Sequence, residues 1–231
     1  MSLAHARVLP LALGSIAIAV LIALGIWQVE RRAWKLDLIA RVEHRLAAAP
    51  VAAPGPARWT TIGKDDAYTR VALTGHYRAG ADTYTQAATD LGAGYWVVTP
   101  FETDSGWTVL VNRGFVPARE RGRHPAATNE QHVTGLLRVS EPGGGFLRSN
   151  DVAADRWYSR DVAAIAAKRR LRAVAPYFVD ADVNGRGWPR TGMTVVRFPN
   201  NHLVYALTWF GLAALVAFLL ARAIRGTQDE G

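Results

Sequence analysis

Two apolar runs without a charged side chain, one near each end, most strongly constrain what this chain can fold into. The first run is Val8–Trp27 and the second is Leu203–Ala221. A helix rises about 1.5 Å per residue, so roughly 20 apolar residues span a hydrocarbon core of about 30 Å. We therefore predict transmembrane helices over residues 8–27 and 201–221. Two spans would hold the intervening chain on one side of a membrane and both termini on the other.

The chain between the two runs is polar and, at about 175 residues, long enough for one compact domain. Trp27, Arg31, Trp34 and Leu38 recur at helical spacing, which predicts that the first helix continues beyond the membrane. Prolines and a glycine in the segment Ala47–Ala57 are typical of a linker. The remaining predicted boundaries are a tail at 1–7, a helix extension over 28–46, a linker over 47–57, a β-rich domain over 58–200 and a tail at 222–231.

The polar middle of the chain shows the period of β-strands. The alternation in Val71–Tyr77 predicts a half-buried strand, and Tyr95–Phe101 and Trp107–Val111 bracket the turn tetrad Thr103–Gly106, which predicts a hairpin. Further strands are predicted over His132–Val139 and 176–179. The fold class is therefore a membrane protein in which two transmembrane helices flank a small, mainly antiparallel β domain with one helix.

The single helix predicted inside the β domain follows Ser159 and Asp161. Ser159 is expected to cap it, and Asp161 suits the positively polarised first turn. Val162, Ile165 and Ala166 then form its apolar face.

Composition excludes several function classes. The chain has no cysteine, which excludes disulfides, catalytic thiols, iron–sulfur ligation and covalent haem attachment through C-x-x-C-H, and argues against copper carriage. It carries no nucleophile elbow, Walker loop, H-E-x-x-H or dinucleotide fingerprint, so we expect a protein that is not an enzyme. Its net charge of +8 suits membrane lipid or an acidic partner, whereas the scattered basic residues do not indicate nucleic acid.

Charge alone leaves the membrane orientation open. Arg31, Arg32 and Lys35 follow the first run, which by the positive-inside rule places the large domain in the cytoplasm. Arg222 and Arg225 follow the second run and favour a cytoplasmic carboxyl terminus instead. Long domains translocate largely regardless of charge, so the rule does not decide.

His202 stands at the start of the second apolar run, where ionisable side chains are uncommon and often functional. In a helix, His202, Tyr205 and Trp209 share a face, and an imidazole above two aromatic rings is a chemically suitable site for haem iron. The alternative is that Asn200 and Asn201 cap the helix and His202 lies among lipid headgroups.

Two further blocks have a functional and a structural interpretation. The first forms either a docking surface for a partner or an ordinary interfacial belt; its candidate residues are Trp27, Gln28, Arg31, Arg32, Trp34 and Lys35. The second block is Asn112–Pro117. Either its residues Arg113 and Phe115 face a partner, or the block is the end of a strand, with a glycine in an unusual backbone conformation and a proline that ends the pairing.

Taken together and in order, five blocks of this chain resemble the surfeit-locus family of cytochrome c oxidase assembly proteins. The blocks are Leu24–Ile39, Val97–Phe101, Val111–Pro117, Arg156–Asp161 and Asn201–Trp209. They extend from the first apolar run to the second, and their ordered combination is specific.

The resemblance implies more than the residues do alone. It implies an assembly factor, or chaperone, of respiratory chain biogenesis that acts on subunit I of cytochrome c oxidase. It also implies haem a binding with His202 as iron ligand and no other metal, with haem a synthase as a second partner. The expected location is the bacterial inner membrane, with the large domain periplasmic and both termini cytoplasmic. The alternative is a cofactor-free scaffold that holds partly assembled subunit I.

Overall fold

In a computed structural model, residues 3–125, 130–145, 147–182, 187–193 and 200–226 are described. The chain divides into two compact units. Residues 1–41 and 197–231 form the first unit, and residues 42–196 form the second. The predicted tails at 1–7 and 222–231 lie partly outside the described residues.

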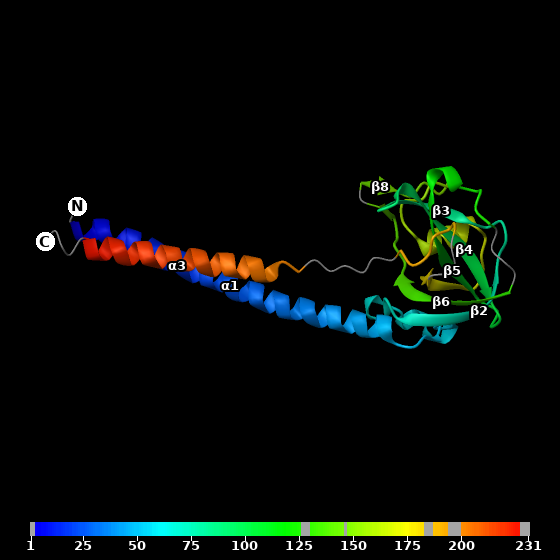
Figure 1. The fold of residues 1–231 in the computed structure, drawn as a ribbon, viewed down its shortest axis with the longest axis horizontal. Coiled ribbons are helices and arrows are strands. Elements are labelled where there is room, and N and C mark those ends of the chain that lie inside the picture. The colour runs from blue at the N-terminus through cyan, green and yellow to red at the C-terminus, as the bar shows by residue number, and fades with distance from the viewer. Residues whose placement is uncertain (1–2, 126–129, 146, 183–186, 194–199, 227–231) are drawn as a thin grey trace. The chain divides into compact units, whose positions relative to one another are not determined.

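The helices of the first unit are α1 (Leu3–Ala47), whose residues from Val42 on belong to the second unit, and α3 (His202–Gly226). Both are long and apolar enough to cross a membrane. Gly14 lies beside Leu220 and Gly25 beside Phe210, so the helices pack antiparallel (Figure 1). α1 continues without a break through residues 28–46.

The second unit is built from nine strands and one α-helix among the described residues. The strands are β1 (Val51–Ala52), β2 (Arg70–Tyr77), β3 (Thr83–Thr89), β4 (Gly92–Thr103), β5 (Thr108–Pro117), β6 (Glu130–Val139), β7 (Gly144–Gly145), β8 (Arg148–Ser149) and β9 (Val174–Ala181). The α-helix is α2 (Val162–Lys168), and short 3₁₀ helices lie at Pro56–Thr61, Lys64–Asp66 and Ala118–Glu120.

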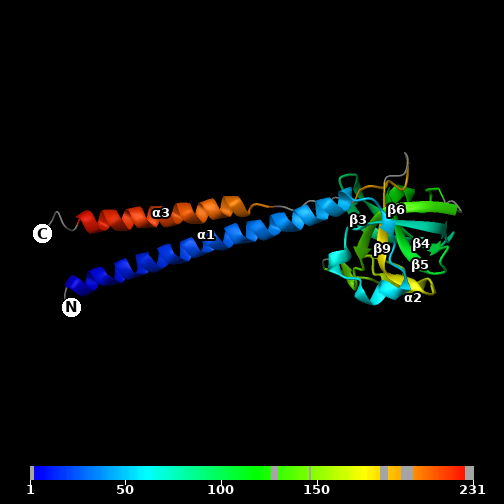
Figure 2. The same ribbon diagram turned by 90° about the horizontal axis from the view of Figure 1, so that it is seen from below.

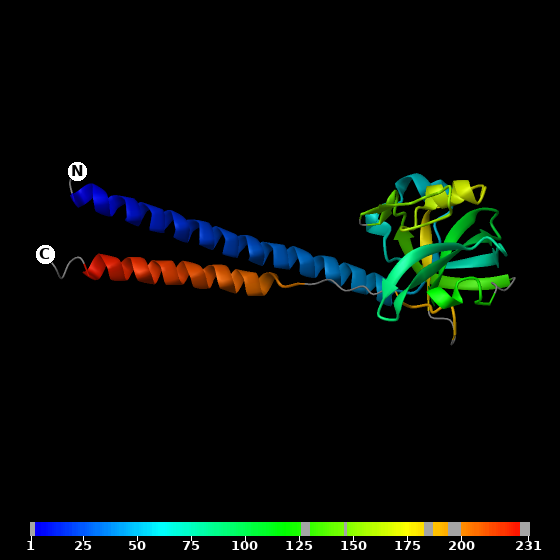
Figure 3. The same ribbon diagram turned by 90° about the horizontal axis from the view of Figure 1, so that it is seen from above.

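Seven of these strands form one sheet in the order β1-β2-β6-β9-β5-β4-β3. An additional pairing of β2 with β4 closes the five central strands into a barrel, and Figure 3 shows these strands curving round. All pairings within the ring are antiparallel except β5 with β9. The predicted, mainly antiparallel β domain is confirmed, and the closure of the barrel is an additional finding.

Side chains on β5 and β9 are buried on both faces of the sheet. Val109, Val111 and Val179 point into the barrel core, whereas Leu110 and Phe178 point outward into a second cluster. That second cluster includes Val162 and Ile165 of α2, so this helix covers the outside of the sheet (Figure 2). Strands buried on both faces show a continuous apolar run rather than alternation, as Val109–Val111 of β5 does.

The predicted hairpin is confirmed. β4 and β5 pair antiparallel with Phe101 opposite Val109, and Gly106 takes a φ of 81° in the turn between them. The cap of α2 differs from the prediction, because Asp161 is the N-cap residue and its Oδ1 accepts from the Ala164 N–H at 3.1 Å. The Ser159 hydroxyl instead donates to the Glu141 carbonyl at 2.7 Å.

The segment expected to be a linker is attached to the barrel. Val51 of β1 pairs in parallel with Val71 of β2. The carbonyl oxygen of Pro54 accepts from the Tyr177 hydroxyl at 2.7 Å and from the Trp59 indole at 3.1 Å. α1 ends at Ala47 and a 3₁₀ helix begins at Pro56, and the hydrogen bonds of the residues between them give this segment a fixed place on the β domain.

Candidate functional site

A direct side-chain contact joins the two long helices at the histidine singled out above. The Nδ1 atom of His202, the first residue of α3, lies 2.7 Å from the Oε1 atom of Gln28 on α1. Gln28 is 8% exposed, and His202 is half-buried. An amide oxygen only accepts hydrogen bonds, so Nδ1 is the donor and carries the imidazole proton. The Nε2 atom of the neutral ring therefore has a free lone pair.

Glycines on α1 allow the close approach that this contact needs. A Cβ atom added at Gly25 would lie 2.4 Å from Cε1 of Phe210, and one added at Gly14 would lie 2.9 Å from Cδ1 of Leu220. Small residues at a helix interface let two backbones approach, and this is a common device in membrane helix pairs. The pairing brings Gln28 within hydrogen-bond distance of His202.

The two aromatic residues predicted beside His202 have different surroundings. Tyr205 is 54% exposed. Trp209 is half-buried, and its indole Nε1 is inaccessible and has no hydrogen-bond partner among the described residues. A buried donor without an acceptor costs about 1–3 kcal/mol, so Trp209 offers an unused N–H beside the helix contact.

The block Trp27–Lys35 divides between two faces of α1. Trp27 and Trp34 are 53% and 46% exposed, and the Arg31 guanidinium lies 4.1 Å from the centroid of the Trp34 ring. Arg32 and Lys35 are half-buried. The prediction that Gln28 belongs to an exposed docking surface is wrong, because Gln28 is buried against His202.

The structure also corrects the partner-facing prediction for Arg113 and Phe115. Phe115 is fully buried in β5, with its ring 5.9 Å from that of Trp96. The Arg113 side chain is only 12% exposed, and its NH2 group donates to the Pro125 carbonyl at 3.1 Å. Since β-strand side chains alternate between the two faces of a sheet, a strand between two packed layers leaves neither residue for a partner.

Gly114, which lies between these two residues, agrees with the strand-end interpretation. Gly114 has a φ of 121°, and an added Cβ would lie 2.3 Å from the Arg190 carbonyl oxygen, so this position requires glycine. Tyr77 lies below the Arg113 guanidinium, and burial raises the pKa of Tyr77 to about 12, although Arg113 opposes the rise.

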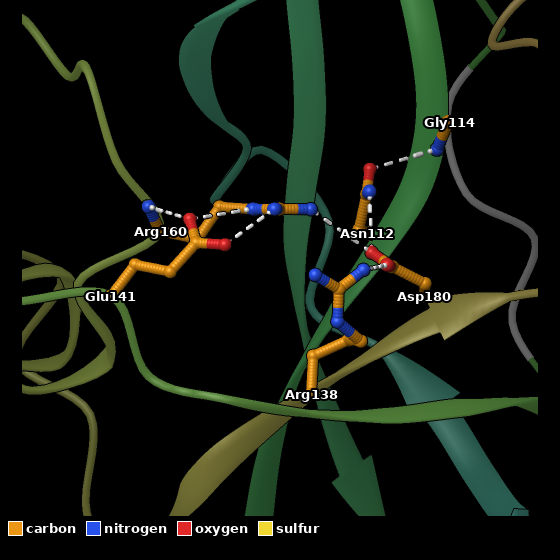
Figure 4. Close-up of polar contacts among 6 residues, drawn as sticks. All are labelled: Asn112, Gly114, Arg138, Glu141, Arg160 and Asp180. Atoms are coloured by element: carbon orange, nitrogen blue, oxygen red, sulfur yellow. Dashed lines mark hydrogen bonds and ion pairs between the residues drawn. The ribbon is translucent and has the colours of Figure 1, made fainter. Parts of the chain in front are cut away.

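A charge network is built round the buried Asp180, on the same face of β9 as Phe178 (Figure 4). Asp180 on β9 accepts from Arg138 at 2.6 Å, from Arg160 at 3.2 Å and from the Asn112 amide at 2.7 Å. Arg160 also donates to both oxygens of Glu141, at 2.6 and 3.0 Å. Two arginines are thus balanced by two carboxylates, as buried charges require.

The network explains why two separate sequence blocks contain the residues they do. Asn112 comes from the block Val111–Pro117, and its Oδ1 accepts from the Gly114 N–H at 3.1 Å. Arg160 comes from the block Arg156–Asp161. Burial alone would lower the pKa of Arg160, but the charges of Asp180 and Glu141 raise it above its usual value. These blocks are therefore joined by the interior of the β domain.

The described residues contain no group of three or more His, Asp or Glu side chains that could hold a metal ion. The described features define a class of protein in which a closed β domain is carried between two helices of membrane-spanning length. The helix pair places a histidine, in contact with Gln28 through Nδ1, at the start of one of them.

Comparison with known proteins identifies the family. The model of the SURF1 family matches residues 15–214, so the chain belongs to this family, as its sequence blocks predict. It is 36% identical to surfeit locus protein 1 of Rattus norvegicus over 221 residues, which cover 86% of this chain and 70% of that protein. Identity to surfeit locus protein 1 of Homo sapiens is 35% over 228 residues, covering 88% and 74%. A bacterial relative, the SURF1-like protein of Rickettsia bellii, is 27% identical over 225 residues, covering 94% and 91%.

Sequence reasoning missed the role of Gln28 and the whole of the Asp180 network. Asp180 was detectable as the single charge in the apolar run Val174–Ala181, whereas Arg138 lies in a strand that also contains His132 and Thr134. The pairing of Gln28 with His202 has no comparable local signal in the sequence. The two residues are 174 positions apart, and their contact depends on how the two helices align with each other.

Proposed function

We propose that this chain is an assembly factor for cytochrome c oxidase that binds haem a through Nε2 of His202 and holds it for subunit I. The observation that carries the proposal is the 2.7 Å contact between His202 Nδ1 and Gln28 Oε1, which in the neutral ring makes Nε2 the nitrogen with the lone pair. A neutral imidazole nitrogen is the common protein ligand of haem iron. Membership of the SURF1 family supports the role in oxidase assembly.

The surroundings of His202 suit a large, flat, mostly apolar cargo. Tyr205 presents an accessible ring one turn from the histidine, and Trp209 lies on the same face of α3. Haem a brings the iron that will serve the oxidase. His202 would supply a single protein ligand to the iron, which suits a carrier that must release what it binds.

The exposed residues of α1 suit contact with a protein partner or with lipid. Trp27, Arg31 and Trp34 are accessible, and aromatic and arginine side chains are enriched where proteins bind one another. We assign this surface to subunit I or to haem a synthase. We further propose cytoplasmic termini in a bacterial inner membrane, with the β domain in the periplasm; Arg222 and Arg225 favour this orientation, although charge alone does not decide it.

The test is complementation of a strain that lacks this protein, followed by measurement of the haem a content of purified subunit I. Wild type is expected to restore haem a, and His202→Ala to lower it at least about tenfold, since the ligand is lost. Asn201→Ala, at the neighbouring exposed position, is the matched control.

A different outcome would favour the scaffold. If His202→Ala restores haem a fully while Arg31→Ala with Trp34→Ala does not, the chain holds subunit I without carrying the cofactor. If His202→Ala alone fails, haem a carriage is the function that the oxidase requires.

A further inference from the structure

We propose that Gln28 is a positioning residue that fixes His202 in its Nδ1–H tautomer and thereby keeps Nε2 as the ligand atom. The consequence for haem a rests on the proposed function, whereas the tautomer itself is a property of this chain without any ligand. Nothing in the family comparison assigns this role to Gln28.

The distance and the burial of the two groups support this assignment. Oε1 of Gln28 and Nδ1 of His202 are 2.7 Å apart, at the short end for a nitrogen donor and an oxygen acceptor. Gln28 is 8% exposed, so water competes little for its amide oxygen. Loss of the bond would leave a buried acceptor unpaired. With the amide oxygen facing the ring, the Nε2–H tautomer cannot make this bond and is therefore disfavoured.

The helix pair holds the two partners in place. Gln28 lies one helical turn from Gly25, which packs against the Phe210 ring of α3. His202 is the first residue of α3, so its backbone is fixed by the same helix that bears Phe210. A ring whose tautomer and orientation are set before binding loses less freedom when it ligates a metal. The arrangement corresponds to the outer hydrogen bond that metal-binding histidines generally make.

The opposite orientation of the amide has the opposite chemistry, which makes the assignment testable. If the amide nitrogen of Gln28 faced His202, it would donate to Nδ1 and force the ring proton onto Nε2. Nε2 would then have no lone pair for iron. In the Nδ1–H tautomer, Nε2 of His202 can therefore ligate iron, and in the Nε2–H tautomer it cannot.

The first experiment measures the tautomer in the full-length protein without haem, using ¹⁵N-histidine NMR in detergent micelles at a pH where the ring is neutral. His202→Ala identifies the signal of His202 by its disappearance. The expected result is a protonated Nδ1 and an unprotonated Nε2. In Gln28→Leu the preference for Nδ1–H is expected to be lost. A protonated Nε2 in the wild type, or the same tautomer in Gln28→Leu, would overturn the proposal.

The second experiment measures haem a binding by titration and absorption spectroscopy, with Glu30→Ala as a control at an exposed position two residues from Gln28. Gln28→Leu is expected to weaken binding about 10- to 100-fold, the usual range for loss of an outer-shell partner. Gln28→Glu keeps an acceptor opposite Nδ1, so it should retain binding while lowering the reduction potential of the bound haem, because a carboxylate makes the imidazole a stronger donor.

The two experiments separate failure of the positioning role from failure of the proposed function. If the wild type has the Nδ1–H tautomer but does not bind haem a, the proposed function fails and the positioning role stands. If the wild type binds haem a through His202 and neither Gln28 variant changes the affinity or the potential, the positioning role is wrong. Should Gln28→Leu fold poorly, the wild-type tautomer and Gln28→Glu still decide.

Discussion

Asp180 is a carboxylate in the interior of the barrel wall, where an unpaired charge would be very costly. Its side chain is 3% exposed and contacts the guanidinium groups of Arg138 and Arg160. The Arg160 guanidinium also lies 4.6 Å from the centroid of the Phe178 ring. Because these charges are withdrawn from water, removing one member leaves its partner as a buried charge without a counterion, which destabilises the fold.

We predict that Asp180→Asn lowers the free energy of unfolding of the β domain by about 3–5 kcal/mol, because Arg138 loses its charged partner inside the protein. Urea unfolding of the full-length protein in detergent, followed by tryptophan fluorescence, measures the change. Asp151→Asn is the control, since Asp151 pairs with Arg156 at the surface. Equal effects of the two substitutions would show that the buried network contributes no more than a surface ion pair.

The candidate site was predictable from the sequence only as far as local spacing reaches. Helical periodicity places His202, Tyr205 and Trp209 on one face of a single helix. Gln28 was assigned to the wrong face of α1, because a helical wheel does not show which face meets another helix. Phe115 was misassigned because a strand covered on both faces has no polar alternation to mark its outward side.

The pairing of α1 with α3 depends on glycine at defined positions. Gly25 of α1 has the ring of Phe210 where its side chain would be, whereas Gly211 of α3 has no atom within 4 Å of an added Cβ. The two glycines lie in similar apolar segments but differ in what they face. Gly25 therefore has a packing role that Gly211 lacks.

We expect Gly25→Leu to separate the helices and break the contact between Gln28 and His202. The added side chain would overlap the Phe210 ring, which lies 2.4 Å from the position of the Cβ atom. The NMR signal of protonated Nδ1 in His202 is the readout, and its loss is the expected result. Gly211→Leu should leave the signal unchanged. Retention of the signal in Gly25→Leu would show that close packing at Gly25 does not hold the site together.

The whole molecule combines two helices of membrane-spanning length with one β domain between them in the sequence. The fold class was predictable because apolar length and strand alternation are local signals. Closure of the barrel through β2 and β4, and the parallel pairing of β5 with β9, were not predictable from local patterns. Both join segments distant in sequence, and neither leaves a mark on the period of the strands.

Membrane topology is testable because the chain has no cysteine to interfere with labelling. In spheroplasts treated with a membrane-impermeant maleimide, Asp104→Cys in the β4–β5 turn is expected to react. Arg225→Cys, near the end of α3, should react only after the membrane is permeabilised. Labelling of Arg225→Cys alone in intact spheroplasts would place the β domain in the cytoplasm and contradict the proposed orientation.

The most direct test of haem a carriage is the absorption spectrum of the purified full-length protein after co-expression with the enzymes of haem a synthesis. We predict a reduced-minus-oxidised haem a band in the wild type and its loss in His202→Ala, with the band retained in Asn201→Ala. A band of equal size in wild type and His202→Ala would assign the iron to another ligand. The absence of a band from well-folded wild type would contradict haem a binding itself.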